Sequence, residues 1–147
     1  EIQRPACLLM EESIALNAQE SEITVLNADL RELGGLFPAG SFDGAVCNPP
    51  YFSGGTRSKN PAVALSIHQD ECGIYDVARC AGRLLKNGGR LWLCYPASRL
   101  AECLHAMVES GLQPKRLRLI DGKNGPYLAL IECLKGGKTG LIIERNL

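Results

Sequence analysis

The chain has 147 residues, of which 46% are apolar and 22% charged, and its 16 basic side chains balance 16 acidic ones. This length suits one domain with a buried core, and the apolar fraction argues against an intrinsically disordered chain. The chain has no apolar run near the roughly 18 residues of a membrane span, and Glu1 to Arg4 lack the basic and apolar regions of a signal peptide, so we expect a cytoplasmic protein with no membrane partner.

The N-terminal part of the chain is predicted to hold one helix and two strands before a long loop. The hydrophobic pattern predicts a helix over residues 5–18 and strands over residues 23–27 and 42–47. The second strand must end before Pro49 and Pro50, because proline lacks the N–H group that a strand donates to its neighbour. From residue 52 to 72 the periodicity is lost, which is typical of a functional or disordered segment.

The rest of the chain alternates between helix and strand. The predicted elements are a helix over residues 74–86, a strand over 90–95, a helix over 97–110, and strands over 113–120 and 127–134. Turn-forming residues join the last two strands and leave no room for a helix, so these strands must be antiparallel. The pattern predicts an α/β domain with a mostly parallel sheet, helices on both faces, and a C-terminal antiparallel hairpin.

Seven scattered cysteines do not form the pattern of a metal site or a disulfide framework. They are Cys7, Cys47, Cys72, Cys80, Cys94, Cys103 and Cys133. No pair is separated by two residues as in a zinc knuckle, and an odd count suits reduced thiols. We expect them to act as small apolar side chains, and we predict no metal.

The balanced net charge hides a gradient along the chain. Residues 1–47 carry two basic and eight acidic side chains, residues 48–110 seven and five, and residues 111–147 seven and three. A basic face can hold a polyanion although the total charge is zero. Ordinary surface solvation explains the same gradient equally well.

The tetrapeptide Asn48-Pro49-Pro50-Tyr51 is the most informative motif, and it follows a predicted strand. Two prolines stiffen the turn and leave backbone carbonyls unpaired. The Asn48 side-chain oxygen and a neighbouring carbonyl then offer two acceptors to one planar NH2 group, while Tyr51 offers a face for a conjugated ring. The motif predicts a pocket for an adenine amine or a carboxamide, and the alternative is a rigid turn with an asparagine cap.

In this position the motif resembles motif IV of the S-adenosylmethionine-dependent amino methyltransferases. With Phe52 and Gly55 it resembles the bacterial transfer-RNA adenine-N6 methyltransferases, which modify an adenine next to the anticodon of a valine transfer RNA. Three further segments, residues 29–33, 83–90 and 132–141, resemble that family in the same order. The resemblance implies a Rossmann-like class I methyltransferase fold, S-adenosylmethionine as cofactor, and tRNA or another RNA as substrate.

The resemblance also implies roles for individual residues. The cofactor-binding residues would be Glu1 at the ribose, Asp29 at the adenine amine with Leu30 beside it, and Asn48. The catalytic residues would be Asn48, Pro49, Pro50 and Tyr51, with Asn48 and Pro49 orienting the target amine and Tyr51 stacking on the base. Phe52 would flank the base as a substrate-binding residue. Independently of the resemblance, the basic side chains predict further substrate-binding residues that contact phosphate, namely Arg57, Lys59, Lys115, Arg116 and Arg118, and a solvated face explains these charges equally well. The alternatives are a frayed terminal residue for Glu1 and a helix N-cap for Asp29.

A first strand and a glycine-rich turn, which the family carries before the position of Glu1, are absent, and the chain begins without Met. We therefore expect one methyltransferase domain represented by its C-terminal part, with a cofactor portion over residues 1–47, motif IV and a substrate loop over 48–72, and a C-terminal half over 73–147. We expect this chain alone to be inactive and not to bind the cofactor. We also expect its exposed sheet edge to favour a homodimer.

Other functions use the same residues. A protein-glutamine methyltransferase places the same tetrapeptide on a carboxamide, and ribosomal RNA or DNA can supply the adenine. A catalytically inactive fragment that acts only as a binding or assembly module is the alternative from a different class.

Overall fold

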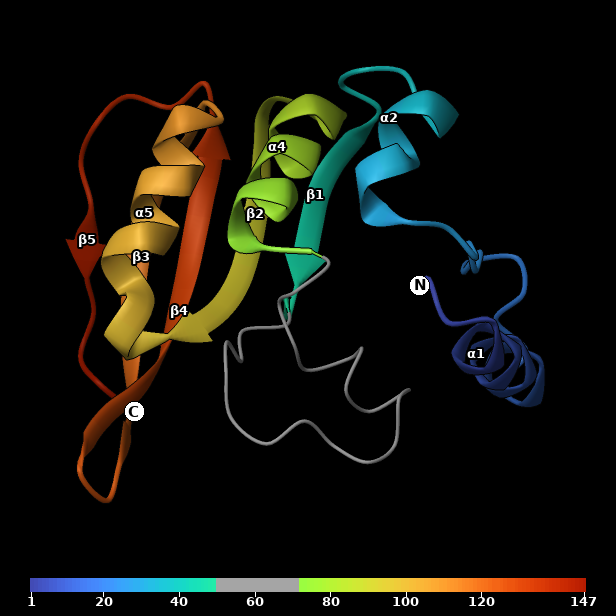
Figure 1. Cartoon of the computed structure of the whole chain (residues 1–147), viewed down its shortest axis with the longest axis horizontal. Coiled ribbons are helices and arrows are strands. Elements are labelled where there is room, and N and C mark those ends of the chain that lie inside the picture. The colour runs from blue at the N-terminus through green and yellow to red at the C-terminus, as the bar shows by residue number, and fades with distance from the viewer. Residues whose placement is uncertain (50–71) are drawn as a thin grey trace.

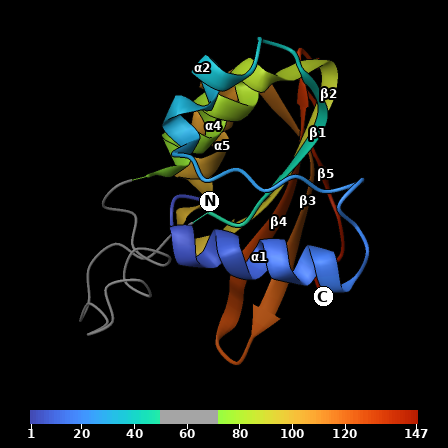
Figure 2. The same ribbon diagram turned by 90° about the vertical axis from the view of Figure 1, so that its right-hand side faces the viewer.

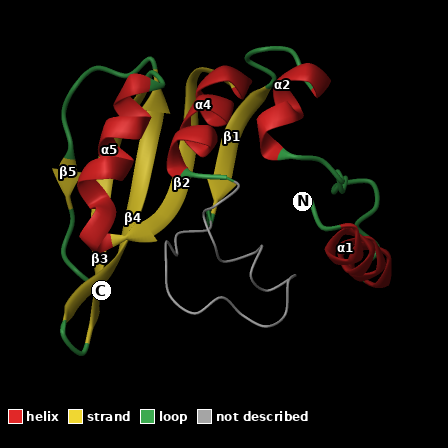
Figure 3. Cartoon of the chain, in the orientation of Figure 1, coloured by secondary structure: helices red, strands yellow, loops and turns green. Residues whose placement is uncertain are grey.

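The computed structural model describes residues 1–49 and 72–147, and its centre is a five-stranded sheet with helices packed beside it (Figure 1). In chain order the elements are α1 (Arg4–Leu16), η1 (Leu30–Glu32), α2 (Leu33–Leu36), β1 (Phe42–Cys47), α4 (Ile74–Leu84), β2 (Leu85–Pro96), η2 (Ala97–Arg99), α5 (Leu100–Glu109), β3 (Leu112–Gly122), β4 (Gly125–Lys135) and β5 (Ile142–Ile143). Figure 3 marks the same elements by type.

The sheet is mixed, with the strand order β1-β2-β4-β3-β5. β1 pairs with β2 and β3 pairs with β5 in parallel, whereas β4 is antiparallel to both β2 and β3. The predicted α/β class and the antiparallel hairpin are confirmed. The expected predominance of parallel pairing is wrong for the described strands, because the β3–β4 hairpin inserts its second strand between β2 and β3.

One face of the sheet forms the core with α4 and α5, which lie on the same side of it (Figure 2). Alternate residues of β2, namely Leu91, Leu93 and Tyr95, are at most 4% exposed and point toward these helices. β4 contributes Ala129 and Ile131 to the same cluster. Both packed helices cover one face in the described part of the chain, so the expected helices on both faces are not seen there.

The predicted strand over residues 23–27 is wrong as a regular element, because the structure assigns no strand there. Its backbone makes a single strand-like pairing with the start of the chain. The Glu1 nitrogen donates to the Leu26 carbonyl at 3.0 Å, and the Ala28 N–H donates to the Glu1 carbonyl at 3.0 Å. These two bonds follow the parallel pattern for one residue pair, Glu1 and Asn27, which is too short to form a strand.

Other boundaries shift for local reasons. α4 ends at Leu84 instead of residue 86, and β2 begins at once at Leu85. The register then jumps, since Phe42 pairs with Leu85 but Gly44 pairs with Arg90. Gly88 has a φ of 83°, which favours glycine, so the expected turn becomes an irregularity inside β2.

The seven cysteines are free thiols, and Cys103 and Cys133 lie in the core as small apolar side chains. Over residues 1–49 and 72–147, no helix has both the length and the apolar character needed to cross a membrane.

Candidate functional site

A cavity of about 810 Å³ lies at the carboxyl end of β1, between that strand, α1 and the segment before η1. Its lining includes Glu1, Asp29, Leu30, Asn48 and Pro49. These residues belong to three separate segments of the chain, and the fold brings all of them to one space. Glu1, Asp29 and Asn48 are therefore neighbours of a single cavity at the carboxyl end of β1, where ligands bind in α/β sheets.

Glu1 is held in place by more than its pairing with Asn27. Its Oε1 accepts a hydrogen bond of 2.8 Å from the N–H of Gln3, just before α1 begins. The side-chain amide of Asn27 donates to the Glu1 carbonyl at 3.0 Å. The backbone of Glu1 is thus ordered, which argues against the frayed-terminus alternative, and its carboxylate keeps lone pairs free for another donor.

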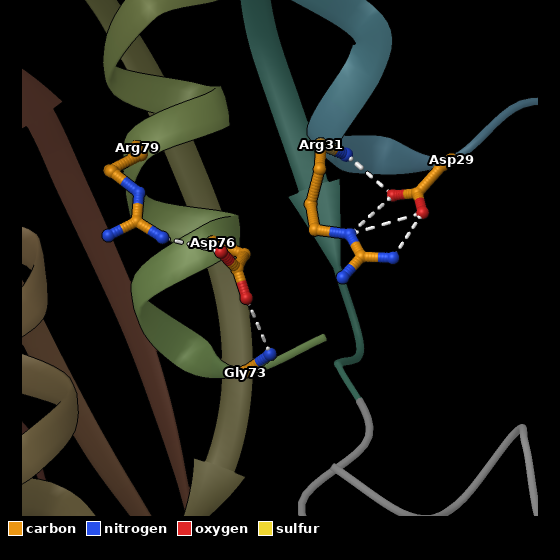
Figure 4. Close-up of polar contacts among 5 residues, drawn as sticks. All are labelled: Asp29, Arg31, Gly73, Asp76 and Arg79. Carbon is orange, nitrogen blue, oxygen red and sulfur yellow. Dashed lines mark hydrogen bonds and ion pairs between the residues drawn. The ribbon is translucent and has the colours of Figure 1, made fainter. Parts of the chain in front are cut away.

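Asp29 is bound on both carboxylate oxygens by Arg31 (Figure 4). Oδ1 accepts from the Arg31 N–H at 2.8 Å and from Nε at 3.0 Å, and Oδ2 accepts from Nη2 at 2.5 Å. The hydrogen bonds from Arg31 hold the pKa of Asp29 below its usual value. Asp29 also caps η1, so the N-cap alternative is confirmed. Arg31 donates two hydrogen bonds to each oxygen, so a ligand at Asp29 has to share an oxygen with Arg31.

Arg31 was not among the residues singled out from the sequence, although it lines the same cavity. The hydrogen bond with Asp29 raises the pKa of Arg31, and Cys72 and Asp76 act in the same direction. Asp76 accepts from the N–H of Gly73 at 3.0 Å and so caps α4 opposite Arg31 (Figure 4). An arginine two residues after an acidic cap was the only signal for this residue in the sequence.

Thiols form part of the cavity wall beside the motif. Cys47 and Cys72 both line the cavity. Burial raises the pKa of the Cys47 thiol to about 11, and the neighbouring thiols add to this shift. Cys47 is therefore a neutral thiol at pH 7, so it adds no charge beside Asn48.

Asn48 lies one residue beyond β1 and borders two cavities. It lines the first cavity and also a second one of about 500 Å³. The second cavity lies on the face of the sheet that points away from α4 and α5, called the open face below. The Asn48 Oδ1 accepts a hydrogen bond of 2.9 Å from the Cys94 thiol of β2. This contact joins residues 46 positions apart, and no sequence pattern indicated it.

The open face carries a row of residues in register across the sheet. Each of the five strands contributes one residue, and each residue pairs with the next across the sheet. In strand order they are Val46, Trp92, Glu132, Arg116 and Ile142. The indole N–H of Trp92 donates to Glu132 at 3.2 Å, and Arg116 forms an ion pair of 3.6 Å with the same carboxylate. This face is therefore partly apolar, with charges that are paired internally.

The predicted phosphate contacts of β3 are placed on or near this face. Arg116 and Arg118 both form ion pairs with Glu144, and the hydrogen bond from Arg116 is the main cause that lowers the pKa of Glu144. The Lys115 ammonium donates to the Lys138 carbonyl at 3.1 Å. Arg116 and Arg118 are compensated by carboxylates, so a phosphate would have to compete with those partners.

Several predicted site residues lie outside the described residues, namely Pro50, Tyr51, Phe52, Arg57 and Lys59. The roles assigned to them from the sequence stay predictions. Within residues 1–49 and 72–147, no group of three or more histidine, cysteine or acidic side chains is arranged to hold a metal ion.

Comparison with curated proteins finds relatives named as tRNA adenine-N6 methyltransferases. A tRNA1(Val) (adenine(37)-N6)-methyltransferase of Shewanella sediminis is 35% identical over 72 residues, which cover 49% of this chain and 30% of that protein. The enzyme of the same name from Tolumonas auensis is 28% identical over 147 residues, covering 100% of this chain and 60% of that protein. No family model matches the chain.

Solved structures agree in fold. A predicted O-methyltransferase from Agrobacterium tumefaciens has a TM-score of 0.76 at 20% identity and covers 100% of this chain and 65% of that one. Geranyl diphosphate C-methyltransferase from Streptomyces coelicolor, solved with S-adenosyl-L-homocysteine, has a TM-score of 0.64 at 12% identity and covers 91% of this chain and 62% of that one.

The chain thus spans 30% and 60% of the lengths of these two curated relatives. The resemblance inferred from the sequence motifs is confirmed by independent matches in sequence and in fold. The chain has the Rossmann-like class I fold of the S-adenosylmethionine-dependent methyltransferases, and in sequence it is similar to the tRNA1(Val) adenine-N6 methyltransferases.

Proposed function

We propose that the protein transfers a methyl group from S-adenosylmethionine to the exocyclic 6-amino group of an adenine in tRNA. The observation that carries this proposal is that Asn48 and Pro49 line the same cavity as Glu1, Asp29 and Leu30. The names of the curated relatives support the choice of adenine and of tRNA.

The residues of the first cavity, at the carboxyl end of β1, fit the cofactor. Its volume of about 810 Å³ lies within the usual range of ligand sites. The carboxylate of Glu1 can accept from both hydroxyls of a ribose. The Asp29 carboxylate can accept from the adenine amine by sharing an oxygen with Arg31. Leu30 supplies an apolar contact to the adenine ring.

Asn48 would orient the target amine. S-adenosylmethionine supplies a methyl group on a positively charged sulfur. The Asn48 Oδ1 and a neighbouring backbone carbonyl accept the two amine hydrogens, which directs the nitrogen lone pair toward the methyl carbon. As the new nitrogen–carbon bond forms, the carbon–sulfur bond breaks and its electrons stay on sulfur, and the amine then loses one proton to water. In this proposal Tyr51 stacks on the base, which must leave any helical stack to reach the site.

The test uses the protein at the length its gene encodes, because the chain spans only part of its relatives. An unmodified valine tRNA transcript, ribosomal RNA, DNA and a glutamine-containing peptide are incubated with labelled S-adenosylmethionine, and digested products are read by mass spectrometry. We expect N6-methyladenosine in the tRNA. Label in the peptide or in the other nucleic acids would redirect the proposal to that substrate, and label in none of them would favour a non-catalytic binding module.

The Asn48→Ala variant tests the assigned role directly. We expect methyl transfer to be lost while the affinity for S-adenosylhomocysteine, measured by calorimetry, stays within about twofold of the unchanged protein, because the amide acts on the amine. Asn124→Ala, in the turn between β3 and β4, is the matched control and should keep full activity. Retained activity in Asn48→Ala would overturn the assignment of Asn48.

A further inference from the structure

Asn48 needs a partner that fixes the plane of its side-chain amide. The last torsion of an asparagine side chain has a broad energy profile, so rotamer preference alone does not set where Oδ1 points. Asn48 also lies beyond the last β1 residue that is paired in the sheet, Cys47. A hydrogen bond to the amide is therefore the feature that can hold its orientation.

Cys94 supplies that hydrogen bond from the neighbouring strand. Its flanking residues, Leu93 and Tyr95, are 4% and 0% exposed beneath the helices, so alternation directs the Cys94 side chain to the open face of the sheet. There its Sγ lies 2.9 Å from Asn48 Oδ1, and both residues line the second cavity.

The chemistry of a thiol suits this contact. A thiol donates one weak hydrogen bond and carries no charge when protonated, and a carbonyl oxygen has two lone pairs. Cys94 therefore takes one lone pair of Oδ1 and leaves the other for an incoming N–H. A lysine or arginine in this place would compete with the substrate amine for the same oxygen far more strongly.

We propose that Cys94 is a positioning residue for Asn48, which presets the amide oxygen at the boundary of the two cavities before the substrate arrives. This inference rests on the proposed function, because it assigns Asn48 the task of orienting the amine. The contact is one neutral hydrogen bond, and its loss corresponds to a decrease of roughly three- to tenfold in the rate of methyl transfer.

Kinetics on the protein at its encoded length test the inference. We expect Cys94→Ala to lower kcat about three- to tenfold with little change in KM for tRNA or cofactor, and Cys94→Ser to restore most of the rate because its hydroxyl also donates. Cys80→Ala is the matched control, since Cys80 is a half-buried thiol of α4 outside both cavity linings. Equal kcat values for Cys94→Ala and the unchanged protein would overturn the inference.

A second readout does not depend on activity. The side-chain NH2 signals of Asn48 are assigned in a nitrogen-proton NMR spectrum by their loss in Asn48→Asp. We expect these signals to shift in Cys94→Ala and to stay in place in Cys80→Ala. If the protein methylates nothing while Cys94→Ala still moves the signals, the proposed function fails and the positioning contact stands. Signals that stay in place in Cys94→Ala overturn the contact itself.

Discussion

The carboxylate of Asp29 is held by the backbone N–H and the guanidinium of Arg31 at the edge of the large cavity (Figure 4). The pairing aims the carboxylate by contacts on both oxygens, which a single cap bond would not do. Asp29 lines the cavity together with Asn48, so its orientation matters for any adenine bound there.

Arg31→Ala should therefore weaken cofactor binding. The side chain of Arg31 is 47% exposed, so the pair is expected to contribute modestly, and we predict an affinity loss of about two- to fivefold. Calorimetric titration of the protein at its encoded length with S-adenosylhomocysteine measures the effect. Arg79→Ala is the control, because Arg79 forms a similar ion pair of 2.5 Å with Asp76 but does not line the cavity. An equal loss in both variants would contradict a specific role for Arg31.

The Asp29–Arg31 pair should also make stability depend on pH. The hydrogen bonds from Arg31 lower the pKa of Asp29 in the folded state below its usual value, so the carboxylate stabilises the fold fully above the pKa of the unfolded chain. As the pH falls below it, the unfolded state takes up the proton first, and the contribution is lost through the lower folded pKa. At pH 7 the free energy of unfolding, measured in urea, should be higher for the unchanged protein than for Asp29→Asn. This difference should shrink at pH 3.

Gly82 of α4 lies against the end of α5. This contact predicts that the single methyl group added by Gly82→Ala lowers stability. A Cβ added at Gly82 would lie 2.4 Å from the backbone oxygen of Ser110, which cannot move without shifting the helix end. We expect Gly82→Ala to lower the free energy of unfolding by about 1–3 kcal/mol. Gly35→Ala in α2 has no atom within 4 Å of the added carbon and should be neutral or slightly stabilising. Chemical denaturation of both variants decides the matter.

The edge of β1 supports the expectation of self-association. In the described residues β1 pairs with β2 alone, and Val46 and Phe42 are 84% and 38% exposed. An unpaired edge beside apolar side chains favours pairing with another copy. We predict a concentration-dependent dimer of the 147-residue chain in sedimentation, which Val46→Lys should weaken. A monomer at all concentrations would contradict the predicted dimer.

Sequence patterns predicted the elements whose signals are local. The prolines at positions 49 and 50 predicted the end of β1, and turn residues predicted the hairpin that ends β3 at Gly122 and begins β4 at Gly125. The pattern failed over residues 23–27, where apolar β-branched residues satisfied every local rule for a strand. A strand also needs a partner edge along its length, and among residues 1–49 and 72–147 the backbone of Glu1 alone makes a strand-like pairing with this segment.

By itself, then, the sequence determined the α/β class, the position of the Asn48 motif after a strand, and the resemblance to the adenine-N6 methyltransferases. The tertiary structure alone decided that Glu1, Asp29 and Asn48 line one cavity, that β4 inserts between β2 and β3, and that the Cys94 thiol donates a hydrogen bond to Asn48 Oδ1. The physical reason is the range of the interactions. Periodicity and turn chemistry act over a few residues, whereas cavities and strand order depend on which distant edges and side chains the folded core brings together.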